Sequence, residues 1–198
     1  MARIDDEGER IHPETTGAWA QWLEQHHARD AGVWLISWRT HTGRPAVSYD
    51  DAVTEALRFG WIDSRMSSLD DDRVMQWFSP RRKGSGWARS NKQRIARLEA
   101  EGRLEPAGRA LVESAEQDGT WALFDDVDNL IVPDDLAAAF AAHPGSREQW
   151  DAFPPSARRA SLEWIVLAKR PATRARRIDE TAELAARGER IDQRRRKA

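Results

Sequence analysis

The residues best suited to chemistry lie in two segments, 61–65 and 81–91, and they favour the binding of an anion. In the second segment, three cationic side chains precede a glycine-serine turn, a tryptophan and the expected N-terminus of a helix. Cations and helix N-termini both attract phosphate and carboxylate groups. The glycine spacing matches neither a P-loop nor a dinucleotide-binding loop, so a plain surface loop is the alternative. The candidate ligand-binding residues are Trp61, Asp63, Arg81, Arg82, Ser85, Trp87, Ser90 and Asn91.

The first segment, WIDSR, is expected to be a β-strand, in which alternate side chains point to opposite faces. Trp61, Asp63 and Arg65 are therefore predicted to share one face. A buried Asp63 needs a partner, and the arginines nearby are the closest donors in the sequence. Two interpretations stay open: a structural ion pair, or a carboxylate that faces a ligand and orients an arginine.

The spacing of residues assembles no set of catalytic groups, so the sequence leaves open whether the protein is an enzyme. The chain has no Cys, which excludes thiolate catalysis, disulfides and thiolate-bound zinc. Its five His contain no HExxH motif, and the adjacent His26 and His27 would diverge on a helix. We therefore expect neither a metal site nor a cofactor.

Composition predicts a globular protein with a highly polar exterior. The 198 residues can form one domain or two small ones, and ten Trp provide large side chains for a core. Charged residues make up 32% of the chain, and the mean hydropathy is −0.75. No apolar run approaches the ~20 residues of a membrane span, and the N-terminus MARIDDEGER lacks the apolar core of a signal peptide. We expect a cytoplasmic protein without a transmembrane segment.

The net charge of −2 hides an uneven distribution. Residues 158–198 contain 13 Lys or Arg and six Asp or Glu, a balance of +7, which leaves −9 for residues 1–157. A basic end can contact an acidic protein, nucleic acid or an anionic membrane surface, or it can be a solvated helix face. Nucleic acid is disfavoured, because the one nearby aromatic residue, Trp164, lies in an apolar run and is expected in the core. The sequence gives no oligomeric state.

Local signals place these residues on an α+β fold. Helices are expected from Thr15 or Thr16 and from Ser48, a strand at 33–38, and a β-hairpin over 61–79. Ser90 is expected to cap the next helix, residues 121–129 to be irregular, and the last third to be helical. We predict a small antiparallel β-sheet packed by helices and followed by a helical C-terminal region, with domains over 1–125 and 126–198.

Four segments, in order, resemble the YdeI/OmpD-associated family, also called bacteriocin-protection proteins. The family names imply an association with a porin and protection against envelope-directed toxins, without a known reaction or ligand. The resemblance implies a role in envelope stress or bacteriocin protection, and the anion-binding residues above would serve it. The alternative is an interaction module whose basic C-terminal helices bind an acidic protein, nucleic acid or a membrane surface. The matching segments are YDDAVTEALRFGWIDS, FSPRRKGSGWARSNKQRIARL, EGRLEPAG and SARRASLEWIVLAKRPATRARRI.

The family signature runs through Gly60, Trp61, Ile62, Asp63, Pro80, Arg81, Ser85, Trp87 and Asn91 of this chain. Two positions depart from the family pattern. Ala88 stands where a second Ser is common, which weakens a hydroxyl-rich anion site. Pro171 and Ala172 stand where acidic residues are common, which alters only the start of a helix.

Overall fold

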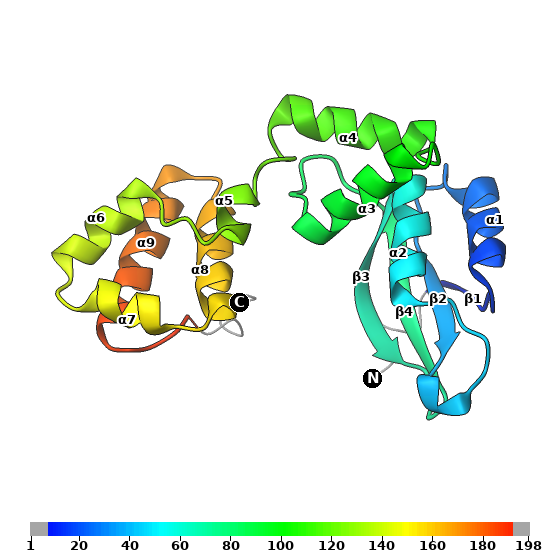
Figure 1. Cartoon of the computed structure of the whole chain (residues 1–198), viewed down its shortest axis with the longest axis horizontal. Helices are drawn as coiled ribbons and strands as arrows, with labels where there is room; N and C mark the ends of the chain where they lie inside the picture. The colour runs from blue at the N-terminus through cyan, green and yellow to red at the C-terminus, as the bar shows by residue number, and fades with distance from the viewer. Residues whose placement is uncertain (1–7, 192–198) are drawn as a thin grey trace. The chain divides into compact units, whose positions relative to one another are not determined.

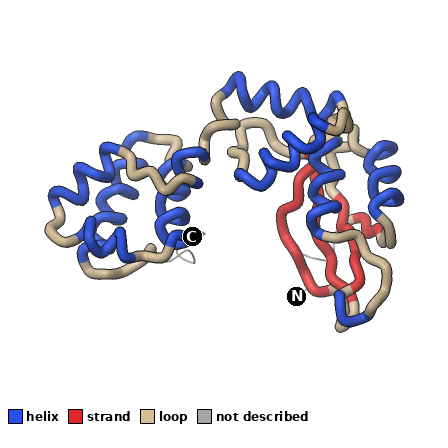
Figure 2. Tube along the Cα trace, in the orientation of Figure 1, coloured by secondary structure: helices blue, strands red, loops and turns tan. Residues whose placement is uncertain are grey.

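A computed structural model of the chain describes residues 8–191, which fall into two compact units that divide between Trp121 and Ala122. Each unit has its own hydrophobic core. The strands of the described chain all belong to the first unit, and the second unit is helical there (Figures 1 and 2). The predicted α+β fold class is confirmed. The domain limits proposed from the sequence, 1–125 and 126–198, stay a prediction.

The sheet of the first unit has four strands in the order β1-β2-β4-β3. The predicted strand and hairpin are β2 (Val33–Trp38), β3 (Trp61–Ser68) and β4 (Arg73–Pro80), which pair antiparallel. The sheet is mixed, because β1 (Glu9–Ile11) pairs parallel with β2. A strand of three residues is too short to show an alternating pattern in the sequence.

Two helices cover one face of this sheet, α1 (Thr16–His26) and α2 (Tyr49–Arg58). The predicted caps are present. The Thr15 hydroxyl accepts a hydrogen bond from the backbone N–H of Ala18 at 3.2 Å, and the Ser48 hydroxyl accepts one from that of Asp51 at 3.1 Å. These caps fix where each helix begins, so they also fix which side chains face the sheet.

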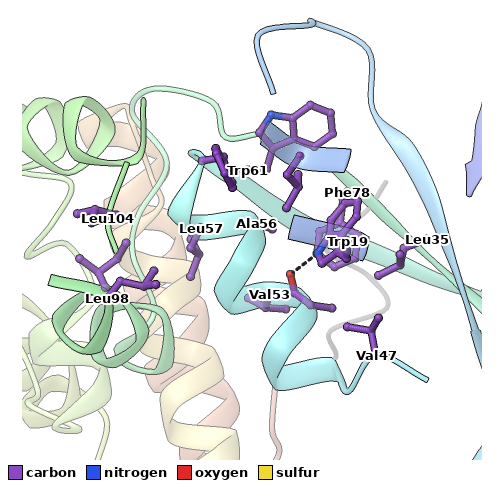
Figure 3. Close-up of a cluster of buried hydrophobic side chains, with 14 of the residues drawn as sticks. Trp19, Leu35, Val47, Val53, Ala56, Leu57, Trp61, Phe78, Leu98 and Leu104 are labelled. Atoms are coloured by element: carbon purple, nitrogen blue, oxygen red, sulfur yellow. Dashed lines mark hydrogen bonds between the residues drawn. The ribbon is translucent and has the colours of Figure 1, made fainter. Parts of the chain in front are cut away.

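Indole rings form the centre of the first core (Figure 3). Trp19 of α1 is fully buried against Phe78 of β4, and its Nε1 donates to the carbonyl oxygen of Ala52 in α2 at 3.0 Å. That bond satisfies the polar atom of the indole, so the ring can be buried without the cost of an unpaired N–H group. Two further helices, α3 (Arg89–Ala100) and α4 (Pro106–Asp118), pack beside α2.

The other face of the sheet carries a smaller cluster. Trp34 and Ile36 of β2 are buried beside Met75 of β4, and Trp77 packs against them. The rings of Trp34 and Trp77 meet edge to face, with centroids 5.2 Å apart. The two faces of the sheet are therefore both apolar, which explains why β2 reads as a continuous hydrophobic run.

The second unit is a set of helices around Leu136, Trp150, Ile165 and Ala182. Its first helix occupies part of the segment that we predicted to be irregular, because residues 125–128 form one helical turn. The helices are α5 (Asp125–Asp128), α6 (Asp134–Ala142), α7 (Ser146–Ala152), α8 (Pro155–Val166) and α9 (Pro171–Ala186).

Candidate functional site

Trp61 belongs to the first core. Its side chain is almost fully buried, and its Nε1 donates to the backbone carbonyl oxygen of His27 at 2.9 Å. The Trp22 ring meets it edge to face, with centroids 5.8 Å apart. The preceding Gly60 has φ +79°, a left-handed conformation that lets the chain leave α2 and enter β3. Gly60 and Trp61 therefore position β3.

A β-bulge in β3 separates Arg65 from Trp61 and Asp63, the other two residues of the predicted trio. Asp63 pairs with Phe78, but Met66 pairs with Gln76, so two residues of β3 oppose one residue of β4. The prediction that Arg65 shares a face with Asp63 is therefore wrong. The Arg65 guanidinium lies on the opposite face, 5.0 Å from the ring centroid of Trp34 and 5.3 Å from that of Trp77.

Asp63 binds two neutral side chains. Its Oδ2 accepts a hydrogen bond from Gln76 Nε2 at 2.7 Å and another from the Tyr49 hydroxyl at 3.1 Å. Neither partner is the arginine that we had expected. Burial and the Asp63 carboxylate both raise the pKa of Tyr49, so its hydroxyl stays protonated at neutral pH.

Arg81 is held inside its own loop. Its Nη2 donates to the carbonyl oxygens of Gly86 at 2.6 Å and Ser85 at 3.3 Å, and its guanidinium lies 3.9 Å from the ring centroid of Trp87. The Ser85 hydroxyl donates to the carbonyl oxygen of Arg82 at 2.6 Å. Burial lowers the pKa of Arg81 to about 10. These contacts use Arg81, Ser85 and Trp87 to shape the loop.

The hollow beside this loop has a volume of only about 10 Å³, which is room for about one water molecule. Its walls include Arg82 and Lys83, which are exposed.

Helix α3 begins one residue after Ala88, which is its N-cap. Ser90, which we had predicted to be the cap, therefore lies in the first turn. Asn91 accepts a hydrogen bond from Arg94 at 3.0 Å. The structure therefore brings Arg81, Arg82, Ser85 and Trp87 together in one loop, whereas Trp61 and Asp63 lie elsewhere in the first unit.

A much larger groove lies at the end of the sheet where β2 leads into α2. Its volume is about 1140 Å³. Strands β2 and β4 form the floor, and the connection between β2 and α2, with the short helix η2 (Thr40–Thr42), forms one wall. Tyr49 and Met66 line the groove, and their side chains are 57% and 68% exposed. The lining residues used below are Trp38, Arg39, Arg44, Tyr49, Met66, Val74 and Gln76.

Two arginines line this groove without an acidic partner among residues 8–191. Arg44 Cζ lies 4.2 Å from the ring centroid of Trp38, which holds the guanidinium in place. Arg39 donates through Nη2 to the Ser68 hydroxyl at 2.7 Å, while its buried Nε has no partner in the described chain. Asp63 lies behind the lining side chains of Tyr49 and Gln76.

Sequence reasoning did not find this groove. Its arginines lie in residues 39–47, which carry no strong helix or strand pattern and look like a solvated loop. Tyr49 gave no signal either. It lies four and seven residues before Val53 and Ala56, so helical spacing places it on their core face, whereas in the structure its side chain is 57% exposed.

The basic helices of the second unit use several arginines internally. Arg174 forms two bonds to the Asp135 carboxylate, at 2.7 and 3.0 Å, and Arg159 binds Asp128 at 2.9 Å. Arg177 donates to the backbone carbonyl oxygen of Trp164. The interaction module predicted for this region stays a prediction, and part of its basic tail, residues 192–198, lies outside the described residues.

Within residues 8–191, no three His, Asp or Glu side chains gather as a metal site would require. None of the helices in that range is both long and apolar enough to cross a bilayer.

Comparison with known proteins gives two family matches along the chain. Residues 11–111, which include the whole groove, match a family described as a domain of unknown function, DUF8412. Residues 129–188 match the family described as "Bacteriocin-protection, YdeI or OmpD-Associated". No curated protein and no solved structure matches the chain.

Proposed function

The chain belongs to the DUF8412 family through residues 11–111 and to the bacteriocin-protection, YdeI or OmpD-associated family through residues 129–188, and from this premise we propose that it binds a small organic anion in the groove between β2, β4 and the 39–47 connection. In this proposal the protein acts in the cytoplasm, in envelope-stress or bacteriocin protection. The family names support that role, and the groove supports the binding.

The observation that carries the proposal is the groove itself. Its volume of about 1140 Å³ is slightly above the ~300–1,000 Å³ that is common for small-molecule sites. Trp38, Met66 and Val74 give it an accessible apolar lining, and such a lining excludes water from a bound hydrocarbon body. By contrast, the hollow at Arg81 has about 10 Å³ and cannot hold an organic ligand.

The arginines supply the anion recognition. Arg44 is held against the Trp38 ring, so less conformational entropy is lost when it binds a ligand. The Arg39 guanidinium is fixed by its Nη2 bond to Ser68 and pairs with no carboxylate among residues 8–191. A guanidinium beside an apolar surface forms strong charge-assisted bonds to a carboxylate or phosphate.

Isothermal titration with octanoate, benzoate and inorganic phosphate tests the proposal. We expect octanoate and benzoate to bind more tightly than phosphate, because phosphate has no apolar body to cover the floor. Arg44→Gln should weaken octanoate binding by about tenfold or more, the worth of one hydrogen bond to a charged group. Arg147→Gln is the matched control, since Arg147 pairs with Asp151 in the second unit.

Two results would contradict the proposal. One is equal octanoate affinity in the wild type, Arg44→Gln and Arg39→Gln proteins. The other is binding that Arg81→Lys abolishes while Arg44→Gln preserves it, which would place the ligand at the loop predicted from the sequence. Thermal unfolding of each variant separates lost binding from lost folding.

A further inference from the structure

The carboxylate of Asp63 decides which atoms the Tyr49 and Gln76 side chains can offer to a ligand. An ionised carboxylate only accepts hydrogen bonds. The Tyr49 hydroxyl and the Gln76 amide nitrogen must therefore both donate to Asp63 Oδ2, at 3.1 and 2.7 Å. This fixes the amide orientation of Gln76.

The atoms left for the groove are acceptors. Gln76 Oε1 has no hydrogen-bond donor among residues 8–191, and the Tyr49 oxygen has given away its only proton while keeping its lone pairs. Both side chains line the groove. The negative charge of Asp63 lies behind them, and Arg94, whose Cζ is 6.0 Å from the Tyr49 ring centroid, is engaged by Asp50 and Asn91.

The groove therefore has two walls of opposite character. The 39–47 connection presents the cationic donors Arg39 and Arg44, while α2 and β4 present the acceptors of Tyr49 and Gln76, backed by a carboxylate. A ligand with only an anionic group would leave these acceptors without partners after it displaces their water. A bound ligand that displaces this water without offering a donor costs free energy, so the second wall favours a ligand that carries a donor.

We propose that the ligand is amphoteric: it carries an anionic group for Arg39 and Arg44, an ammonium group for the Tyr49 and Gln76 acceptors, and an apolar segment between them that contacts Val74 and Met66. This inference rests on the proposed function, because it assigns a second recognition element to the same groove. A hydroxyl in place of the ammonium would satisfy the acceptors but not the Asp63 charge.

The test compares three straight-chain series of increasing length: plain carboxylates, ω-hydroxy carboxylates and ω-amino carboxylates. Affinities are measured by titration calorimetry on the full chain. At the length that spans the two walls, the amino compound should bind about tenfold more tightly than the plain carboxylate, with the hydroxy compound between them. The quantity that matters is this affinity ratio, because a general loss of folded protein cancels in it.

Three variants assign the ratio to its cause. Asp63→Asn and Tyr49→Phe should each reduce the amino-to-plain ratio several-fold, since one removes the charge and the other removes an acceptor. Asp151→Asn, a matched change at an exposed ion pair of the second unit, should leave the ratio as it is in the wild type. Arg44→Gln should weaken plain and amino compounds alike.

The outcomes separate this inference from the proposed function. If amino and plain carboxylates bind the wild type equally, the amphoteric ligand is refuted while the anion site stands. A ratio that persists in both Asp63→Asn and Tyr49→Phe also refutes it. If no carboxylate of any series binds, the proposed function fails, and this inference fails with it.

Discussion

The buried carboxylate of Glu55 leads to an asymmetric prediction about stability. Its side chain is 4% exposed and bonds Arg103, which is 42% exposed, and Arg58, whose Nη1 lies 3.4 Å away. The bond to Arg103 joins α2 to the segment between α3 and α4, whereas the bond to Arg58 lies within α2. Glu55→Gln leaves two arginines that can reach water, whereas Arg103→Gln leaves a buried carboxylate with one distant partner.

The magnitudes follow from what each change leaves behind. Breaking a fully buried pair from one side costs ~3–5 kcal/mol, and the exposure of Arg103 reduces this. We expect Arg103→Gln to lower the free energy of unfolding by about 2 kcal/mol and Glu55→Gln by about 1 kcal/mol. The double variant should lose less free energy of unfolding than the two single variants added together. Both charges of the pair are absent from it, so neither is left without its partner.

Urea denaturation followed by tryptophan fluorescence measures these losses, since most tryptophans lie in the first unit. Arg147→Gln is the control for removal of one exposed arginine. The reasoning is refuted if Glu55→Gln costs more than Arg103→Gln, or if the two effects simply add. Either result would mean that burial of the carboxylate does not control the cost.

Three shorter predictions concern other elements. Gly108→Ala should destabilise the first unit by about 2 kcal/mol, because the added Cβ would lie 2.5 Å from a carbonyl oxygen of α2, while Gly17→Ala, with open space around it, should be neutral or stabilising; thermal unfolding checks both. Arg81→Lys should cost about 1–2 kcal/mol in urea, since Lys cannot reproduce the Nη2 bonds and the stacking on Trp87. Arg174 lowers the pKa of Asp135, so its stabilisation is present above the unfolded pKa of about 3.8 and is lost as pH falls through the lower folded pKa; the stability difference between wild type and Asp135→Asn should therefore vanish in strong acid.

The parts of the fold that sequence could predict are those with local chemical signals. The Ser48 cap and Gly60 at the other end of α2 follow from hydrogen bonding and backbone freedom, and both are present. The start of α3 was misplaced, because its N-cap is Ala88, which makes no side-chain cap bond, while the better capping residue Ser90 lies inside the first turn. At this position the capping preference of Ser did not decide where the helix begins.

The candidate site was harder to predict, because it depends on register. The bulge in β3 occurs at Ser64 and Arg65, and neither residue has the backbone freedom of glycine that would announce it. One extra residue moves Arg65 to the far face and brings Met66 to the groove. A pattern of alternate residues cannot show such a shift, so the trio could not be placed correctly from the sequence.

The segments that carry the family resemblance help to explain why the resemblance predicts the fold better than the ligand. In this chain, Gly60 turns into β3, Trp61 is buried in the core, and Arg81 closes its loop over Trp87. These roles are architectural. The groove cations Arg39 and Arg44 lie outside all four of these segments, although the DUF8412 match over residues 11–111 includes them. The resemblance in the four segments therefore predicts the framework of this protein, while the identity of its ligand has to be sought in the 39–47 connection.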